Sequence, residues 1–247
     1  MNRYSDCSDD FYINVHLNTE MDLPSNRETV LHYFEQVRRK YPTMRNFYGR
    51  ERGEYVLEEE KEGGQYRWTT VEPRRVCTGQ VNPETIEQAL DLHRFVLELA
   101  PYSLSASPLD CESLNVMFGF DFTYRGNHNQ VVAEALGVPP AFEKLTDIGG
   151  ANVVGYEPGI QLALDEDCRV QCRVGVETRT GGMHMRTGQF PEEQLSVYIT
   201  ARRFGSLEPG QDFVTTLDLL AGVCRDLAET YVIDAILRPL QKTIALK

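Results

Sequence analysis

One order of elements, a strand, a helix, three strands and a long helix, occurs twice in succession along the 247 residues. The apolar spacing defines each element, because a half-buried strand alternates with period two and an amphipathic helix repeats about every 3.6 residues. The first copy is expected over residues 1–110 and the second over residues 111–247. Since each copy must cover one face of its strands with helices, the two copies are expected to join into one compact unit.

The first copy begins with an alternating strand at residues 11–18. A helix is expected over 27–41, with Ser25 and Glu28 forming a capping box at its start. Further strands are expected at 55–60, 65–72 and 75–81, followed by a helix that Pro83 opens and Pro101 ends.

The second copy begins with a long strand whose apolar face runs from Leu114 to Tyr124. A short helix capped by Asn127 and an irregular stretch at 137–159 follow. The next strands are expected at 160–165, 169–178 and 194–203. A helix from about Gln211 should be the longest element. The glycines that bound the segment 181–188 favour a mobile hairpin tip.

The strand-to-helix joints of the two halves also correspond. Val81-Asn82-Pro83-Glu84-Thr85 matches Leu207-Glu208-Pro209-Gly210-Gln211 in position. The expected fold class is therefore α+β, a tandem duplication of a β-α-β-β-β-α unit that forms a curved, mostly antiparallel sheet with helices on one face. Coincidence is the alternative, because mixed strands and helices are common in α+β proteins.

This topology resembles the duplicated saddle of TATA-binding-protein-like folds and, less closely, the tandem-repeat ligand-binding domains of the GyrI type. Element order alone carries the resemblance, and no motif of either family occurs. The resemblance therefore implies a shape and no activity.

Composition narrows the expected partners. A formal net charge of -12 argues against nucleic acid, because phosphate binding depends on clustered Lys and Arg. A basic cluster at 38–52 is attributed to a helix end, where the helix dipole favours cations. The chain has no apolar run of about 20 residues, and residues 1–10 do not read as a signal peptide. We therefore expect a cytoplasmic protein without a membrane partner.

Few residues indicate catalysis or a cofactor. Cys168 and Cys172 lie four positions apart, a separation of ~13 Å along a strand and too far for one metal ion. Neither a phosphate-binding loop nor a catalytic signature occurs. His93 is expected to be a core histidine bonded to the backbone, and His128 lies at a strand-to-helix turn where capping or an anion would suit. No metal or cofactor is expected.

The strongest candidate site is the polar face of the two opening strands. Their alternation should place six residues on that face or at its end: Tyr12, Asn14, His16, Asn115, Asp121 and Arg125. These side chains could orient a protein partner or a small ligand by hydrogen bonds, although a solvated surface is the alternative.

Three functions are therefore open. The leading hypothesis is a non-enzymatic binding or interaction protein that presents a curved sheet face. The second is an enzyme in which His16 and Asp121 form an acid–base pair, with Arg125 nearby. The third is a structural homo-oligomer that pairs exposed sheet edges.

Overall fold

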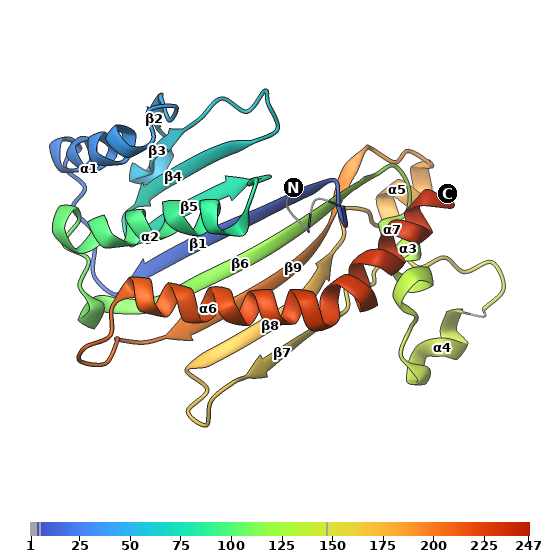
Figure 1. The fold of residues 1–247 in the computed structure, drawn as a ribbon. Helices are drawn as coiled ribbons and strands as arrows, with labels where there is room; N and C mark the ends of the chain where they lie inside the picture. The colour runs from blue at the N-terminus through green and yellow to red at the C-terminus, as the bar shows by residue number, and fades with distance from the viewer. Residues whose placement is uncertain (1–3, 5, 147) are drawn as a thin grey trace.

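The computed structural model describes residues 4, 6–146 and 148–247. They form an α+β fold around one nine-stranded antiparallel sheet in the order β2-β3-β4-β5-β1-β6-β9-β8-β7 (Figure 1). The strands are β1 (Asp10–Thr19), β2 (Asn46–Gly49), β3 (Tyr55–Glu58), β4 (Tyr66–Glu72), β5 (Arg75–Val81), β6 (Cys111–Tyr124), β7 (Gly159–Ala163), β8 (Val170–Glu177) and β9 (Glu193–Phe204). The opening strands of the two halves, β1 and β6, pair at the centre.

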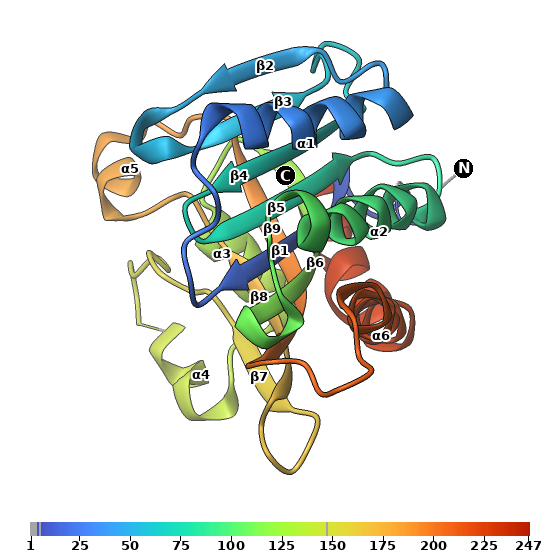
Figure 2. The same cartoon turned by 90° about the vertical axis from the view of Figure 1, so that its left-hand side faces the viewer.

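Three helices cover one face of the sheet, and the others lie at one end of it or on the opposite side. The three are α1 (Arg27–Lys40), α2 (Ile86–Ser103) and α6 (Phe213–Leu227), while α4 and α5 project on the opposite side (Figure 2). The remaining helical segments are η1 (Glu51–Gly53), η2 (Pro108–Asp110), α3 (His128–Leu136), α4 (Pro140–Thr146), α5 (Gly182–Thr187), the π-helical η3 (Ala228–Leu237) and α7 (Arg238–Ala245). Together, α6, η3 and α7 form the long closing helix that the sequence predicts.

The core lies between the sheet and α1, α2 and α6. Every second side chain of β1 is at most 1% exposed on this side: Phe11, Ile13, Val15 and Leu17. Phe118 and Phe120 of β6 are buried beside Phe11, with ring centroids 5.7 and 5.1 Å from its ring. Burial of such a side chain contributes roughly 1.5–3 kcal/mol. This contribution fixes the register, because a slip by one residue would turn the apolar set toward the other face.

Several predicted boundaries were wrong for local reasons. Asn26, and not Ser25, caps α1, because its side chain accepts a hydrogen bond from the Thr29 N–H at 2.8 Å. Pro101 lies inside α2, which continues to Ser103. A proline near the last turn removes only one backbone donor, and the helix ends two residues later. The irregular stretch 137–159 contains α4, and the expected hairpin tip contains α5.

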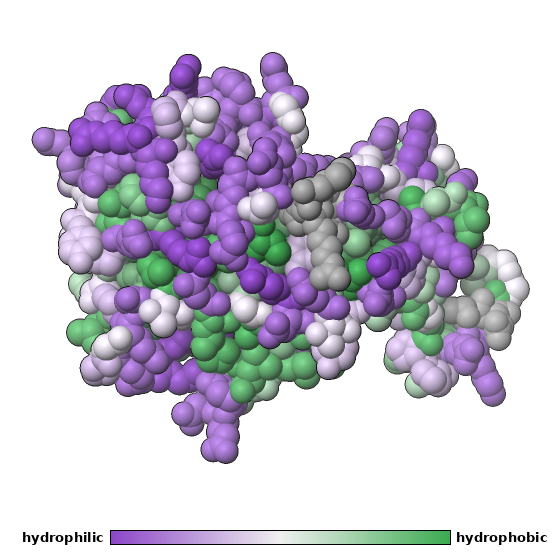
Figure 3. Space-filling model, viewed as in Figure 1, coloured by the Kyte–Doolittle hydropathy of each residue, from purple (hydrophilic) through white to green (hydrophobic). Residues whose placement is uncertain are grey.

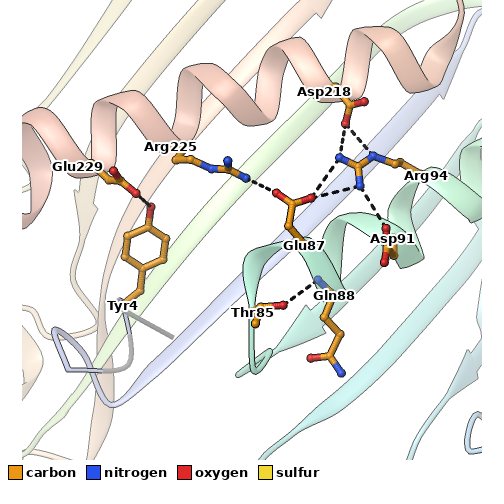
Figure 4. A network of polar contacts seen from close by, with 9 residues as sticks. All are labelled: Tyr4, Thr85, Glu87, Gln88, Asp91, Arg94, Asp218, Arg225 and Glu229. Atoms are coloured by element: carbon orange, nitrogen blue, oxygen red, sulfur yellow. Dashed lines mark hydrogen bonds and ion pairs between the residues drawn. The ribbon is translucent and has the colours of Figure 1, made fainter. Parts of the chain in front are cut away.

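An ionic network joins the exposed sides of α2 and α6 (Figure 4). Glu87 lies between two guanidinium groups, with Arg225 Nη2 at 2.8 Å and Arg94 Nη1 at 3.4 Å. Arg94 also contacts Asp218 of α6 at 2.8 Å and Asp91 of its own helix at 3.2 Å. The network therefore fixes the two helices relative to each other over the β1 and β6 strands.

The helices leave the β7 edge of the sheet uncovered. Figure 3 shows apolar residues gathered over β7 and β8, below α6. Ile160, Leu162 and Leu164 are 59%, 45% and 46% exposed there. Register places Ile160 opposite Val174 and Leu162 opposite Cys172, on the side of the sheet that elsewhere forms the core.

Candidate binding face

The face opposite α1, α2 and α6, here called the open face, is formed by the alternate residues of the same strands. On β1 it carries Tyr12, Asn14 and His16, each between two buried apolar residues. Register places these three opposite Gly119, Met117 and Asn115 of β6. The structure therefore brings together the two central strands on which the sequence analysis placed its candidate residues.

Tyr12 and Asp121 meet at one end of this face. The Tyr12 hydroxyl donates a hydrogen bond to Asp121 Oδ1 at 3.3 Å. The ring lies on Gly119, where an added β-carbon would be 2.3 Å from Tyr12 Cε2. Burial raises the pKa of Tyr12 and that of Asp121. Ser196 is a further partner of Asp121.

His16 lies farther along β1, opposite Asn115. Burial, assisted by the charges of Arg75 and Arg202, lowers the pKa of His16 to about 4. The imidazole is therefore neutral at pH 7. Asp121 is opposite Asp10, six residues from His16, which corresponds to ~20 Å along the strand. His16 and Asp121 do not form the predicted acid–base pair, because the antiparallel register separates them.

The two asparagines of the central strands have polar atoms without partners. The side-chain oxygens Asn14 Oδ1 and Asn115 Oδ1 are buried and accept no hydrogen bond within the described residues. Asn115 is 7% exposed. Asn14 Oδ1 lies beside the Trp68 indole, and both come within 2.4 Å of the point where Gly79 would carry a β-carbon. Such unsatisfied buried oxygens each cost about 1–3 kcal/mol.

Arg125 is not part of the central cluster. It follows the end of β6, and its Nε donates to the Phe190 carbonyl at 3.2 Å. With Met183 and His184 it lines a separate hollow beside α5. Arg125 therefore lies at the periphery, and the prediction that it would be close to His16 was wrong.

The sequence analysis missed the contribution of β8 and β9 to the open face. A hollow of about 240 Å³ lies beside β6 and is lined by Met117, Arg173, Gly175, Glu177, Tyr198 and Thr200. A neighbouring hollow of about 110 Å³ shares Arg173 and Thr200 and is also lined by Arg202. The alternation of Ser196, Tyr198, Thr200 and Arg202 with Val197, Ile199 and Ala201 was the signal available in the sequence.

A larger groove, of about 720 Å³, runs past α5 and Asn129. Its polar groups bond within the protein. Asn129 Nδ2 donates to the Thr180 carbonyl at 2.8 Å, and Asn129 Oδ1 accepts from the Tyr156 N–H at 2.7 Å. The His128 N–H donates to Thr180 Oγ1 at 2.9 Å. These bonds explain the polar residues around the α3 N-terminus without a ligand, in contrast with Asn14 and Asn115.

The open face is suited to hydrogen bonding and to holding charge. Burial raises the pKa of the Cys77 thiol to about 12, so this sulfur stays protonated at pH 7. Among the described residues, no three His, Cys, Asp or Glu side chains gather as metal ligands. No helix in the described part of the chain has the length and apolarity needed to cross a bilayer.

The chain has no match to any protein-family model or to any curated protein. Function is therefore inferred from the geometry of the open face.

Proposed function

We propose that this chain is a non-enzymatic binding protein that receives a small ligand on the open face, over β1, β6 and β9. The observation that carries the proposal is the pair of buried side-chain oxygens, Asn14 Oδ1 and Asn115 Oδ1, that lack a donor within the described residues. Buried polar atoms in folded proteins are almost always hydrogen-bonded. A ligand with donor groups that displaces the covering side chains would satisfy these oxygens. The hollow of about 240 Å³ begins at Met117, which register places opposite Asn14.

Two properties support binding over acid–base catalysis. His16 has a pKa of about 4 and is therefore a weak base at pH 7. The carboxylate proposed as its partner, Asp121, lies six residues along the strand and is already bonded to Tyr12. The open face thus offers positioned hydrogen-bonding groups, while His16 and Asp121 are too far apart to act as an acid and base together.

Native mass spectrometry of the protein purified gently from its own cells tests the proposal. The wild-type chain is expected to carry a small molecule that is lost under denaturing conditions. The Asn14→Leu/Asn115→Leu variant should fold, because replacing unsatisfied polar groups by apolar ones is nearly neutral, and should lose the molecule. Asn152→Leu, at an exposed position, is the matched control and should retain it. A wild-type chain without ligand, or a ligand retained by the double variant, would contradict the proposal.

We further infer that the binding face arose by tandem duplication. The element order β1-α1-β3-β4-β5-α2 corresponds to β6-α3-β7-β8-β9-α6, and strand order outward from the central pair is β5-β4-β3 on one side and β9-β8-β7 on the other. This arrangement supports a saddle of the TATA-binding-protein-like or GyrI-like kind. The additional strand β2 has no counterpart in the second half.

A second candidate function is self-association through β7. In the described residues this strand pairs only with β8, and all five of its residues are exposed. An unpaired edge without Lys or Pro is a template for another strand. An antiparallel copy of β7 would place Ile160 and Leu162 of the two chains together about a twofold axis.

A further inference from the structure

We infer that the ligand of the open face is anionic, and that Arg173 and Arg202 bind its carboxylate or phosphate group. This inference rests on the proposed function and specifies the chemical class of its ligand. The two arginines come from neighbouring strands, β8 and β9, and both line the hollow of about 110 Å³.

Register makes the two arginines diagonal neighbours. Arg173 lies opposite Thr200, and Arg202 lies opposite Gln171. Diagonal β-carbons of this kind are roughly 7 Å apart, a separation that two long side chains can span to reach one oxyanion. Thr200 lies between them and adds a hydroxyl donor to the same hollow.

Neither guanidinium has an acidic partner among the described residues, although the sequence has 37 Asp and Glu against 25 Lys and Arg. Nearby arginines are paired, since Arg169 contacts Glu208 at 2.9 Å and Arg179 contacts Glu177 at 3.4 Å. Arg202 Nε is in addition buried without a hydrogen-bond acceptor. Two guanidinium groups without an acidic partner beside one hollow leave positive charge there, and a bound anion would neutralise it.

The two guanidinium groups lie over different rows of the sheet. The Arg202 guanidinium lies 5.4 Å from the centre of the Phe204 ring. The Arg173 guanidinium lies over Gly175, with Nε 3.4 Å from the position of an added β-carbon. Because Gly175 has no side chain, Arg173 can fold toward the larger hollow beside Tyr198. Arginine binds carboxylate and phosphate oxygens in a bidentate manner. An anion in the hollow that both side chains line would be bound once the two guanidinium groups turn toward it from Gly175 and Phe204.

The rest of the ligand would lie in the hollow of about 240 Å³. Its walls include the Met117 thioether, the Tyr198 ring and the Thr200 hydroxyl. The Asn115 oxygen is on the adjacent row of the sheet, opposite His16. The expected ligand is therefore a small organic acid or phosphomonoester whose non-ionic part has apolar surface and at least one hydrogen-bond donor.

Nuclear magnetic resonance titrations at constant ionic strength test the inference, with inorganic phosphate and acetate as separate probes and chloride as the reference. Saturable shifts of the Arg173 and Arg202 Nε–H signals are expected for at least one probe. Bound anion should also raise the pKa of His16, because it offsets the charge of Arg202. Arg173→Gln/Arg202→Gln is expected to weaken binding at least tenfold. Arg173→Lys/Arg202→Lys, which keeps charge but loses the fork, should be intermediate.

Arg38→Gln/Arg39→Gln is the matched control, because it removes the same charge from the exposed end of α1. It should leave the affinity within twofold. Saturation with phosphate alone indicates a phosphomonoester, and saturation with acetate alone indicates an organic acid. Non-saturable shifts with both probes, or equal affinity in the Arg173→Gln/Arg202→Gln variant, would overturn the inference.

Failure of this inference can be separated from failure of the proposed function. A co-purifying molecule that is lost in Asn14→Leu/Asn115→Leu but retained by Arg173→Gln/Arg202→Gln would place a neutral ligand on the open face. The anion inference would then be wrong and the binding function would stand. A molecule retained by both variants would contradict both.

Discussion

Burial of His93 of α2 lowers the free energy of unfolding by an amount that depends on pH. It is fully buried, as the sequence analysis predicted, and its ring lies close to the Ile13 backbone, although neither ring nitrogen has the geometry of a hydrogen bond within the described residues. Burial lowers the pKa of His93 from its ordinary value of 6.5 to about 3. Between these values the unfolded chain binds a proton that the folded chain does not. The free energy of unfolding therefore falls as pH decreases below 6.5, by about 1.4 kcal/mol per pH unit.

His93→Leu should reduce this dependence. Urea unfolding at pH 7 and pH 5 is the measurement, and the variant is expected to lose less stability over that range than the wild type does. His16→Gln is the comparison, because the pKa of His16 is also lowered, to about 4, from a different face of the sheet. Equal pH dependence in wild type and His93→Leu would show that His93 is not the source.

Gly119 is required by the close approach of Tyr12. An added β-carbon would be 2.3 Å from the Tyr12 ring and would push the hydroxyl away from Asp121. Gly119→Ala should therefore lower the free energy of unfolding by about 1–3 kcal/mol. Gly222→Ala, in the α6 helix with no atom within 4 Å of the added carbon, should instead raise it by ~0.5–1 kcal/mol. Similar effects of the two changes in urea unfolding would disprove the packing argument.

At the scale of elements, apolar periodicity was sufficient to predict most of the strands and the longer helices. β1, β3 to β9, α1, α2, α3 and α6 lie close to their predicted positions. β2 and α5 were not predicted, because four and six residues are too few to establish a period. The same limit applies to the site. The alternation of polar and apolar residues identified the open face. This alternation gives no information on strand register, and the register separates His16 from Asp121.

The contact between α2 and α6 includes an ion pair whose coupling free energy should be measurable. Glu87 and Arg225 come from separate helices and are joined at 2.8 Å, with 59% and 37% of their side chains exposed. A double-mutant cycle with Glu87→Ala and Arg225→Ala is expected to give a coupling of about 0.5–1 kcal/mol at low salt. Salt should weaken this coupling by screening.

The direction in which pH changes the coupling between Glu87 and Arg225 follows from the pKa of Glu87. The hydrogen bond from Arg225 lowers the pKa of Glu87 below its ordinary value of 4.5. The coupling should therefore be present above that value and be lost as pH falls through the lowered pKa. The pair Asp234 and Arg238, which lies within one continuous helical stretch, is the control. A coupling between Glu87 and Arg225 no larger than that of the control would show that the pair does not join the helices.

For the whole molecule, the two halves differ most in how they cover the sheet. In the first half α1 packs against the core through Val30, Tyr33, Phe34 and Val37. In the second half, α3, the helix that follows β6, instead contacts α7 at the end of the sheet. The apolar side of β7 is exposed, whereas Val56 and Leu57 of β3 are buried.

This exposed edge predicts weak, salt-dependent self-association. Pairing of β7 with its copy would bury Ile160 and Leu162, but each chain carries a net charge of -12, so the two copies repel. Added salt screens this repulsion and should favour the dimer, whereas an association held by ion pairs would weaken. Sedimentation velocity over a concentration series, at low and high salt, measures the dimer fraction.

Leu162→Lys should keep the chain monomeric at all concentrations, because it places a charge on the paired edge. Leu246→Lys, at a 79% exposed position near the C-terminus, should dimerise as the wild type does. A wild type that stays monomeric at high salt would contradict the pairing. So would dimers that persist in Leu162→Lys. Gln161 of β7 also lines the hollow of about 110 Å³ beside Arg173. Because Ile160 and Leu162 lie on the other face of the strand, a ligand in that hollow should leave the dimer fraction unchanged if edge and face act independently.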